Sequence, residues 1–228
     1  MNNIKDVYRK IAHAAMRAGR CPSEVKLIAV SKGVGAETIK SAVENGIREL
    51  GENRIQEAQD KITIITACMP EAMVKWHLIG HLQKNKAKSA VDLFDIIHSV
   101  DSPELAGLLN RYAGEAGKKQ KILLQIKLSD EESKYGMLKE HLIEILGGIR
   151  HLENLQVEGL MTIPPYFNDP EMVRPFFREL RGIKDKAVQA GFGLSELSMG
   201  MSNDFEVAIE EGATMVRVGT AIFGERSY

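Results

Sequence analysis

The chain has 228 residues, of which 44% are apolar and 27% charged, and this composition excludes disordered, collagen-like and disulfide-built proteins. The chain has thirty Lys and Arg residues and thirty-one Asp and Glu residues, which gives a net charge of −1. Since the two signs are mixed along the whole length, the charge pattern argues against a nucleic-acid-binding protein. No uninterrupted apolar run approaches the roughly 18 residues that cross a bilayer, so we expect no membrane contact.

The opening segment and the cysteines indicate a cytoplasmic protein. The first twenty residues lack the apolar core of a secretory signal, and Cys21 and Cys68 are too few and too isolated for a disulfide framework. Apolar residues at helical spacing predict an amphipathic opening helix: Ile4, Val7, Ile11 and Ala15.

Short β-branched runs then alternate with helical segments. The predicted strands are residues 26–30, 49–50, 75–79, 93–98, 121–127, 155–160, 196–198 and 215–218. The predicted helices are residues 36–45, 53–65, 84–91, 103–116, 138–150, 170–190 and 203–211. This alternation predicts a parallel sheet, and eight such units favour one domain over residues 1–228, a closed (β/α)8 TIM barrel with an extra N-terminal helix. A doubly wound sheet is the alternative, because the second strand is very short.

A barrel of this kind carries its chemistry at the carboxyl ends of its strands. Lys32 closes the run LIAVSK after the first predicted strand, where a neutral lysine could form an imine with a carbonyl group. The turns SMGMSND and RVGT follow the seventh and eighth strands, where barrels bind phosphate through free backbone N–H groups and hydroxyls. Residues 202–204 also predict a helix N-cap, and the two interpretations are compatible.

Arg217 stands between Val216 and Val218, so strand alternation sends its side chain to the opposite face. If the valines pack against the helices, the guanidinium enters the barrel and needs an acceptor, either a structural carboxylate or a ligand atom. His77 and His81 lie in a strand and turn and do not form a helical zinc pair, so we expect no metal.

Together, Lys32, the two glycine turns and Arg217 resemble the pyridoxal 5'-phosphate (PLP) homeostasis proteins, the YggS/PROSC family, which share the barrel domain of alanine racemase. The matching stretches cover residues 26–226 in order: LIAVSK, ELGENRIQEAQDK, WHLIGHLQKNK, HSVDS, GLMTIPP, DPEMVRPFF, LSMGMSNDFEVAI and VRVGTAIFGER.

The resemblance implies PLP as the cofactor and Lys32 as the residue that forms the internal aldimine. It also implies that Arg217 faces the pyridine nitrogen and that Asn53 lies near the cofactor ring. The remaining implied positions bind the phosphate (Ser202, Gly219 and Thr220) or shape the adjoining turn (Ser198, Met199 and Gly200).

An arginine at the pyridine nitrogen disfavours protonation and weakens PLP as an electron sink. A racemase also needs a second base, which alanine racemase takes from an additional domain, and the contexts of Tyr166 and Tyr228 do not suggest that role. We therefore expect a PLP carrier without established turnover, a monomer or weak dimer that buffers PLP or delivers it to PLP-dependent apoenzymes. The alternatives are a minor racemase-like PLP enzyme and a barrel that binds another phosphorylated ligand.

Overall fold

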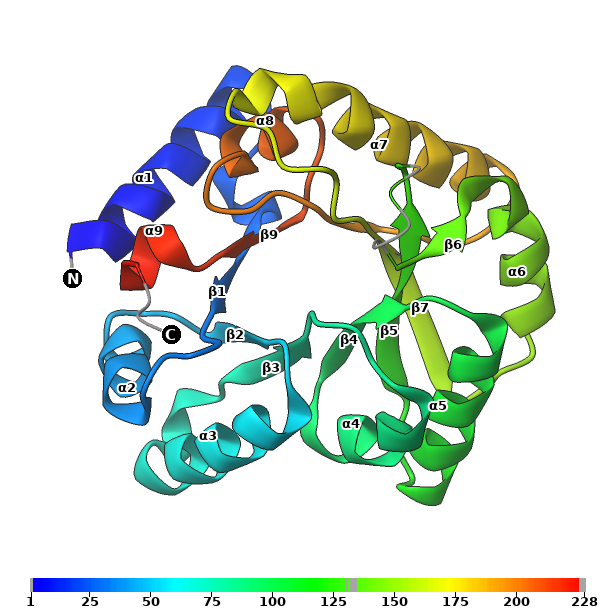
Figure 1. Ribbon diagram of the computed structural model, residues 1–228, viewed down its shortest axis with the longest axis horizontal. Helices are drawn as coiled ribbons and strands as arrows, with labels where there is room; N and C mark the ends of the chain where they lie inside the picture. Colours follow the sequence, from blue (N-terminus) through cyan, green and yellow to red (C-terminus); the bar gives the residue numbers. More distant parts are fainter. Residues whose placement is uncertain (1, 130, 132–134, 226–228) are drawn as a thin grey trace.

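The computed structural model describes residues 2–129, 131 and 135–225, and its strands form a closed parallel ring surrounded by helices (Figure 1). The ring strands are β1 (Lys26–Val30), β2 (Glu49–Glu52), β3 (Lys75–Leu78), β4 (Ile96–Val100), β5 (Gln120–Lys127), β7 (Leu155–Met161), β8 (Glu196–Ser198) and β9 (Met215–Val218). Pairing of β1 with β9, which places Ile28 opposite Arg217, closes the ring. The predicted eight-stranded barrel is confirmed.

One helix precedes the first strand, and each of the others follows a strand along the described chain. They are α1 (Asn2–Arg17), α2 (Ala36–Glu44), α3 (Ile55–Cys68), α4 (Ala87–Leu93), α5 (Pro103–Glu115), α6 (Leu142–Ile149), α7 (Arg174–Gln189), α8 (Phe205–Glu210) and α9 (Thr220–Phe223). Short 3-10 turns precede two strands, β1 and β3, as η1 (Pro22–Glu24) and η2 (Pro70–Ala72). Others precede the helices α4, α6 and α7, as η3 (Lys84–Lys86), η4 (Lys139–His141) and η5 (Pro170–Val173). Across the described ranges, every helix is too short or too polar to cross a bilayer.

The predicted opening helix is confirmed as α1, which packs against α8 and α9 beside the seam between the first and last strands (Figure 1). Its apolar stripe is buried at Ile4, Val7 and Ile11. An amphipathic helix in this position covers apolar surface that α8 and α9 alone would leave exposed.

Several element bounds differ from the predicted ones by a few residues, and α9 was not predicted. Two further differences concern strands. The fourth strand begins at Ile96 rather than at residue 93, because α4 continues through Leu93 and the carboxylate of Asp95 then accepts a hydrogen bond from the Trp76 N–H. A further short strand, β6 (Met137–Leu138), was not predicted. It pairs with the end of β5 outside the closed ring, and so short a segment carries no periodicity of its own.

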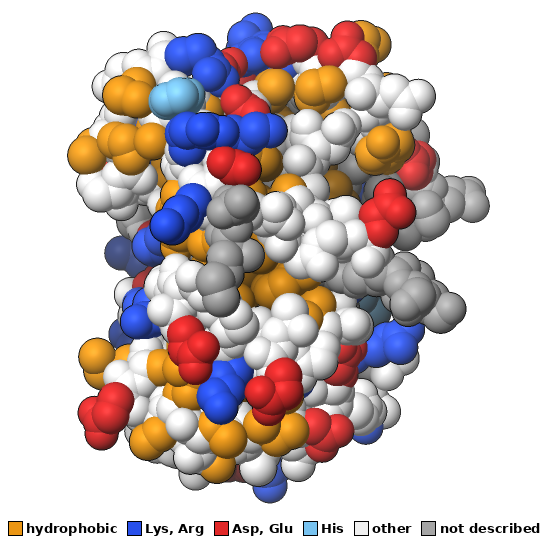
Figure 2. Space-filling view, turned by 90° about the vertical axis from the view of Figure 1, so that its left-hand side faces the viewer, with side chains coloured by type: hydrophobic (Ala, Val, Ile, Leu, Met, Phe, Trp, Pro, Cys, Tyr) orange, Lys and Arg blue, Asp and Glu red, His pale blue; other side chains and the backbone are white. Residues whose placement is uncertain are grey.

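Strand alternation separates two apolar clusters. The larger one fills the space between strands and helices, and a small one lies inside the barrel: Ile28, Ile96, Leu123, Met161 and Met215. Buried polar side chains share that interior, among them His77, His98 and Ser198. On the outside, basic and acidic side chains are interspersed over the face shown in Figure 2.

Candidate functional site

A cavity of about 430 Å³ opens at the carboxyl-terminal ends of β1, β2 and β9. This volume is typical of a site for a small molecule or cofactor. Most of the predicted site residues line it: Lys32, Asn53, Ser202, Arg217, Gly219 and Thr220. The closed barrel therefore brings residues from both ends of the sequence to one mouth.

Arg217 enters the barrel, as strand alternation predicted. Val216 and Val218 belong to the outer core, whereas the arginine side chain is directed inward and the residue is only 4% exposed. Its Nη1 donates to Ser198 Oγ at 2.6 Å and its Nη2 donates to the Thr162 carbonyl at 2.8 Å. The acceptors are thus a hydroxyl and a backbone oxygen rather than a carboxylate. Burial lowers the pKa of Arg217 to about 10, which leaves it charged at neutral pH.

The other predicted residues, Ser198, Met199 and Gly200, lie beneath the cavity and not on its wall. Ser198 and Met199 are fully buried, and Gly200 has a φ of +92°, which favours glycine. A Cβ at Gly200 would lie 2.6 Å from the Cβ of Ala208, so a side chain there would push the turn away from α8. These residues hold the turn in place while its next residues reach the cavity.

The hydroxyl of Ser202 joins the two glycine turns. Its Oγ accepts hydrogen bonds from the Gly219 N–H at 3.2 Å and from the Ala221 N–H at 3.4 Å. The prediction of free N–H groups on these turns is therefore wrong for Gly219. Because the turns lie side by side, the hydroxyl is a ready acceptor for both groups.

A buried ion pair, which the sequence did not predict, fixes the backbone just before Lys32. Ser31 donates its hydroxyl proton to Glu52 Oε1 at 2.6 Å, and Lys61 Nζ donates to the same oxygen at 2.8 Å. Lys61 also donates to the Ser31 carbonyl at 2.5 Å. Burial raises the pKa of Glu52, although the hydrogen bonds from Lys61 and Ser31 oppose that shift.

The same lysine links to the residue that follows Lys32. Lys61 donates to Glu57, and the carboxylate of Glu57 accepts from the Gly33 N–H. Burial opposes ionisation of Glu57, but the bonds from Lys61 and Gly33 outweigh it and lower the pKa of this group. Spacing of four residues on α3 could have indicated the Glu57–Lys61 pair. We call Glu52, Glu57 and Lys61 the backbone clamp.

Asn53 follows β2 and lines the cavity with a buried amide oxygen. Its Oδ1 has no hydrogen-bond partner among the residues that the structure describes. Gly80 packs closely against it, since a Cβ at Gly80 would lie 2.3 Å from the Asn53 carbonyl oxygen. A buried acceptor without a partner is costly unless a ligand group meets it.

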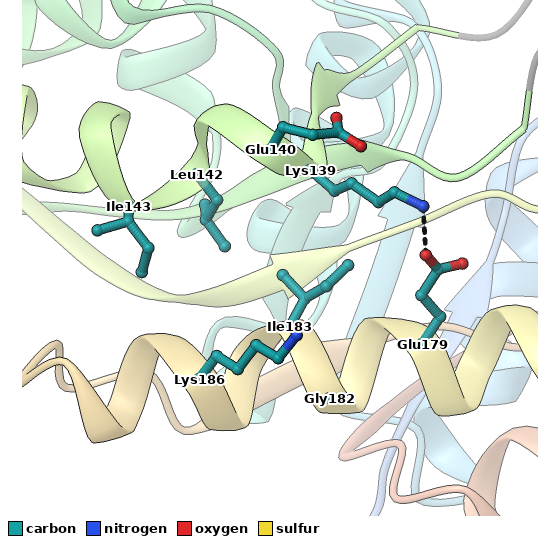
Figure 3. A pocket seen from close by; sticks show the side chains of 8 residues that line it. All are labelled: Lys139, Glu140, Leu142, Ile143, Glu179, Gly182, Ile183 and Lys186. Carbon is teal, nitrogen blue, oxygen red and sulfur yellow. Dashed lines mark hydrogen bonds and ion pairs between the residues drawn. The ribbon is translucent and has the colours of Figure 1, made fainter.

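A second hollow in the described part of the chain contains none of the predicted site residues. The groove of about 520 Å³ between α6 and α7 is lined by Leu142, Ile143 and Ile183 and includes the ion pair between Lys139 and Glu179 (Figure 3). Within the described ranges, no three His, Cys, Asp or Glu side chains lie close enough to bind a metal ion. Tyr166 lines the main cavity and is 72% exposed, whereas Tyr228 lies outside the described residues.

The fold and the lysine- and arginine-lined mouth correspond to one class of barrel. A family model for the alanine racemase N-terminal domain matches residues 3–227. A protein from Aquifex aeolicus named pyridoxal phosphate homeostasis protein is 43% identical over 99% of this chain and 97% of its own length. The protein of that name from Escherichia coli K12 is 38% identical over 100% of this chain and 97% of its own length. The chain therefore belongs to the alanine racemase N-terminal domain family and, within it, to the pyridoxal phosphate homeostasis proteins.

Solved structures agree with this relationship. PipY of Synechococcus elongatus PCC7942, solved with PLP bound, is 42% identical, with a TM-score of 0.83 over 94% of this chain and 100% of that chain. Alanine racemase of Clostridium difficile 630 is 17% identical, with a TM-score of 0.75, and matches 100% of this chain but 58% of its own. The second likeness shows a shared barrel fold.

Proposed function

We propose that this protein binds PLP at the barrel mouth, holds it as an imine of Lys32, and buffers it or delivers it to PLP-dependent apoenzymes without catalytic turnover. The observation that carries the proposal is one 430 Å³ cavity that combines an amine, a buried guanidinium and two hydroxyl-bearing turns. The relatives named for PLP homeostasis and the PLP-bound PipY structure support the same ligand. In this proposal residues 1–228 act as one PLP-binding domain, as a monomer or weak dimer.

The donors at the mouth suit the phosphate and the ring of PLP. The hydroxyls of Ser202 and Thr220 would bind the phosphate, on a turn shaped by Ser198, Met199 and Gly200. The Gly219 N–H would join them by exchanging its hydrogen bond to Ser202 Oγ for one to the phosphate. The unpartnered oxygen of Asn53 would accept a hydrogen bond from a hydroxyl group on the ring. The Lys32 amine would add to the aldehyde carbon with loss of water, and PLP supplies the electrophilic aldehyde for that bond.

Arg217 accounts for the proposed lack of turnover. A guanidinium only donates hydrogen bonds, so a pyridine nitrogen facing it accepts one and stays unprotonated. This arrangement weakens the electron withdrawal on which reactions of PLP enzymes at Cα depend. Its bonds to Ser198 and Thr162 leave other N–H groups of the guanidinium available for that contact.

The test compares the visible absorbance of the wild type and Lys32→Ala with added PLP, followed by borohydride reduction and peptide mass mapping. We expect an imine band in the wild type only, and a reduced adduct on the peptide that contains Lys32. If neither protein binds PLP, the proposed function is wrong. If Lys32→Ala binds a phosphorylated ligand as well as the wild type does, the cavity serves another phosphorylated ligand.

Tyr166 supports a second candidate, a minor PLP enzyme acting on amino acids. It lines the same cavity as Lys32, so a phenol is within the site, although most of its side chain is exposed to solvent. Enantiomer interconversion or solvent hydrogen exchange at Cα by the purified protein, lost in Tyr166→Phe, would favour this candidate over a carrier.

A further inference from the structure

A continuous chain of hydrogen bonds crosses the barrel interior from Arg217 to the opposite mouth. Arg217 Nη1 lies 2.6 Å from Ser198 Oγ, which lies 2.9 Å from His98 Nδ1. His98 Nε2 lies 2.9 Å from His77 Nδ1, and His77 Nε2 lies 2.6 Å from Glu49 Oε2. We call Ser198, His98, His77 and Glu49 the interior relay.

The relay occupies a place that barrels normally fill with apolar side chains. Interior layers of (β/α)8 barrels consist mainly of branched apolar residues, which pack without needing partners. Here the apolar interior residues include Ile28 and Leu123, yet His77, His98 and Ser198 are all 0% exposed beside them. A network this deeply buried is stable only if every member is satisfied.

When each histidine carries a single ring proton, the direction of the hydrogen bonds follows from the two ends. Arg217 can only donate, and the ionised carboxylate of Glu49 can only accept. If each group donates to the next, Ser198 donates to His98 Nδ1, His98 Nε2–H donates to His77 Nδ1, and His77 Nε2–H donates to Glu49. Both histidines are then neutral and carry their proton on Nε2.

The charges around the two ends agree with this direction. Burial, reinforced by neighbouring positive charges that include Arg217, holds the pKa of His98 well below its ordinary value. Burial opposes ionisation of Glu49, but the hydrogen bond from His77 and the charges of Lys75 and Lys26 lower its pKa. A neutral His98 and an ionised Glu49 are the states that the direction of the chain requires.

We infer that the interior relay is a set of positioning residues that fix the orientation of the Arg217 guanidinium from below, so that its free N–H groups face the cavity. The inference rests on the proposed function where it assigns the pyridine nitrogen of PLP as the partner of those N–H groups. Loss of one link leaves a buried imidazole without its acceptor. The remaining members then exchange donor and acceptor roles, and this rearrangement extends along the relay to the hydrogen bonds of Arg217.

The variants are chosen at His77, which does not touch Arg217 or the cavity. His77→Leu breaks the chain, whereas His77→Gln keeps an acceptor for His98 and a donor for Glu49. Met161→Leu alters the same apolar interior but removes no hydrogen-bonding group of the relay, and it is the matched control. Thermal melts establish which variants fold, and Glu49→Ala, which removes the terminal acceptor, replaces His77→Leu if that variant does not fold.

The first measurement uses the protein without PLP, so that it is independent of the proposed function. In ¹⁵N-labelled wild type we expect both histidines to carry their proton on Nε2 and the Arg217 Nη groups to give separate, slowly exchanging signals. The slow signals should persist in His77→Gln and Met161→Leu and be lost in His77→Leu. A proton on Nδ1 in the wild type, or slow signals that persist in His77→Leu, would overturn the inference.

The second measurement uses the PLP-loaded protein. We expect His77→Leu to release PLP about tenfold faster than the wild type, which corresponds to a loss of about 1.4 kcal/mol of ground-state binding. We also expect the absorbance band of bound PLP to shift in this variant. His77→Gln and Met161→Leu should stay within about twofold of the wild type. Equal release from His77→Leu and Met161→Leu would contradict the link to the cofactor, whereas a wild type that binds no PLP would contradict only the proposed function.

Discussion

The guanidinium of Arg217 is the group at the cavity whose replacement most directly tests the proposed cofactor chemistry. Arg217→Glu places a carboxylate where the proposal has the pyridine nitrogen, and a carboxylate favours protonation of that nitrogen. We expect a changed absorbance band of bound PLP and faster transamination side reactions in a variant that circular dichroism shows to be folded. Arg217→Met removes the donors without adding a base, and it should not gain these side reactions. An unchanged spectrum in Arg217→Glu would count against the placement of Arg217.

Lys61 provides a second prediction at the scale of single residues. Its side chain is 9% exposed and its partner Glu52 is 0% exposed, so Lys61→Met leaves a carboxylate buried without its cation. We expect a loss of about 3 kcal/mol in the free energy of unfolding, measured by urea denaturation. Lys88→Met, at an exposed lysine of α4, should change this free energy by less than about 0.5 kcal/mol.

Contacts between residues far apart in the sequence explain why only part of the site was predictable. Lys32 and Arg217 were predicted from strand ends and alternation, which are local features of the sequence. The interior relay was missed because its members lie far apart in the sequence. His98 is 21 positions from His77 and 100 positions from Ser198. A single sequence gives no signal for contacts that exist only after the barrel closes.

At the scale of elements, the turn between β8 and α8 depends on a left-handed backbone at Gly200. Gly200→Ala should lower the free energy of unfolding by more than about 1 kcal/mol, since the new Cβ meets both the unfavourable φ and Ala208. Gly182→Ala is the matched control in α7, where a Cβ meets open space and alanine favours the helix by about 0.5–1 kcal/mol. If both variants unfold at the same urea concentration, the turn is less constrained than its geometry indicates.

Element boundaries were less predictable than element order. Apolar residues stand on both sides of Asp95 in the run from residue 93 to 98, so periodicity alone could not separate the end of α4 from the start of β4. The boundary is set by the contact between Asp95 and the backbone of Trp76 on the neighbouring strand. Alternation of strands and helices, in contrast, is repeated along the whole chain and was sufficient to predict the barrel.

At the scale of the whole molecule, ion pairs connect α1, α7 and α8. Arg17 contacts Glu210, while Arg174 contacts Glu210 and Glu211, and Arg178 contacts Glu211. Burial opposes ionisation of Glu211, but the bonds from Arg178 and Arg174 outweigh it and lower its pKa in the folded state.

This network predicts a dependence of stability on pH. A carboxylate with a lowered pKa in the folded state stabilises the protein above the unfolded pKa, about 4.3, and that contribution is lost as the pH falls through the folded pKa. We expect the melting temperature to decrease below about pH 4.5, with a shallower decrease in Glu211→Gln. An identical acid dependence in both proteins would show that Glu211 does not contribute.

Pairing between β1 and β9 has a consequence for synthesis on the ribosome. Until residues 215–218 leave the ribosome, one edge of β1 stays unpaired and can bind other nascent chains. Parallel sheets whose paired strands lie far apart in the sequence share this hazard. Arg217 lies in the strand that closes the ring, so it joins Lys32 only when that edge disappears. A nascent chain thus acquires its complete cavity in the same step that removes its exposed edge.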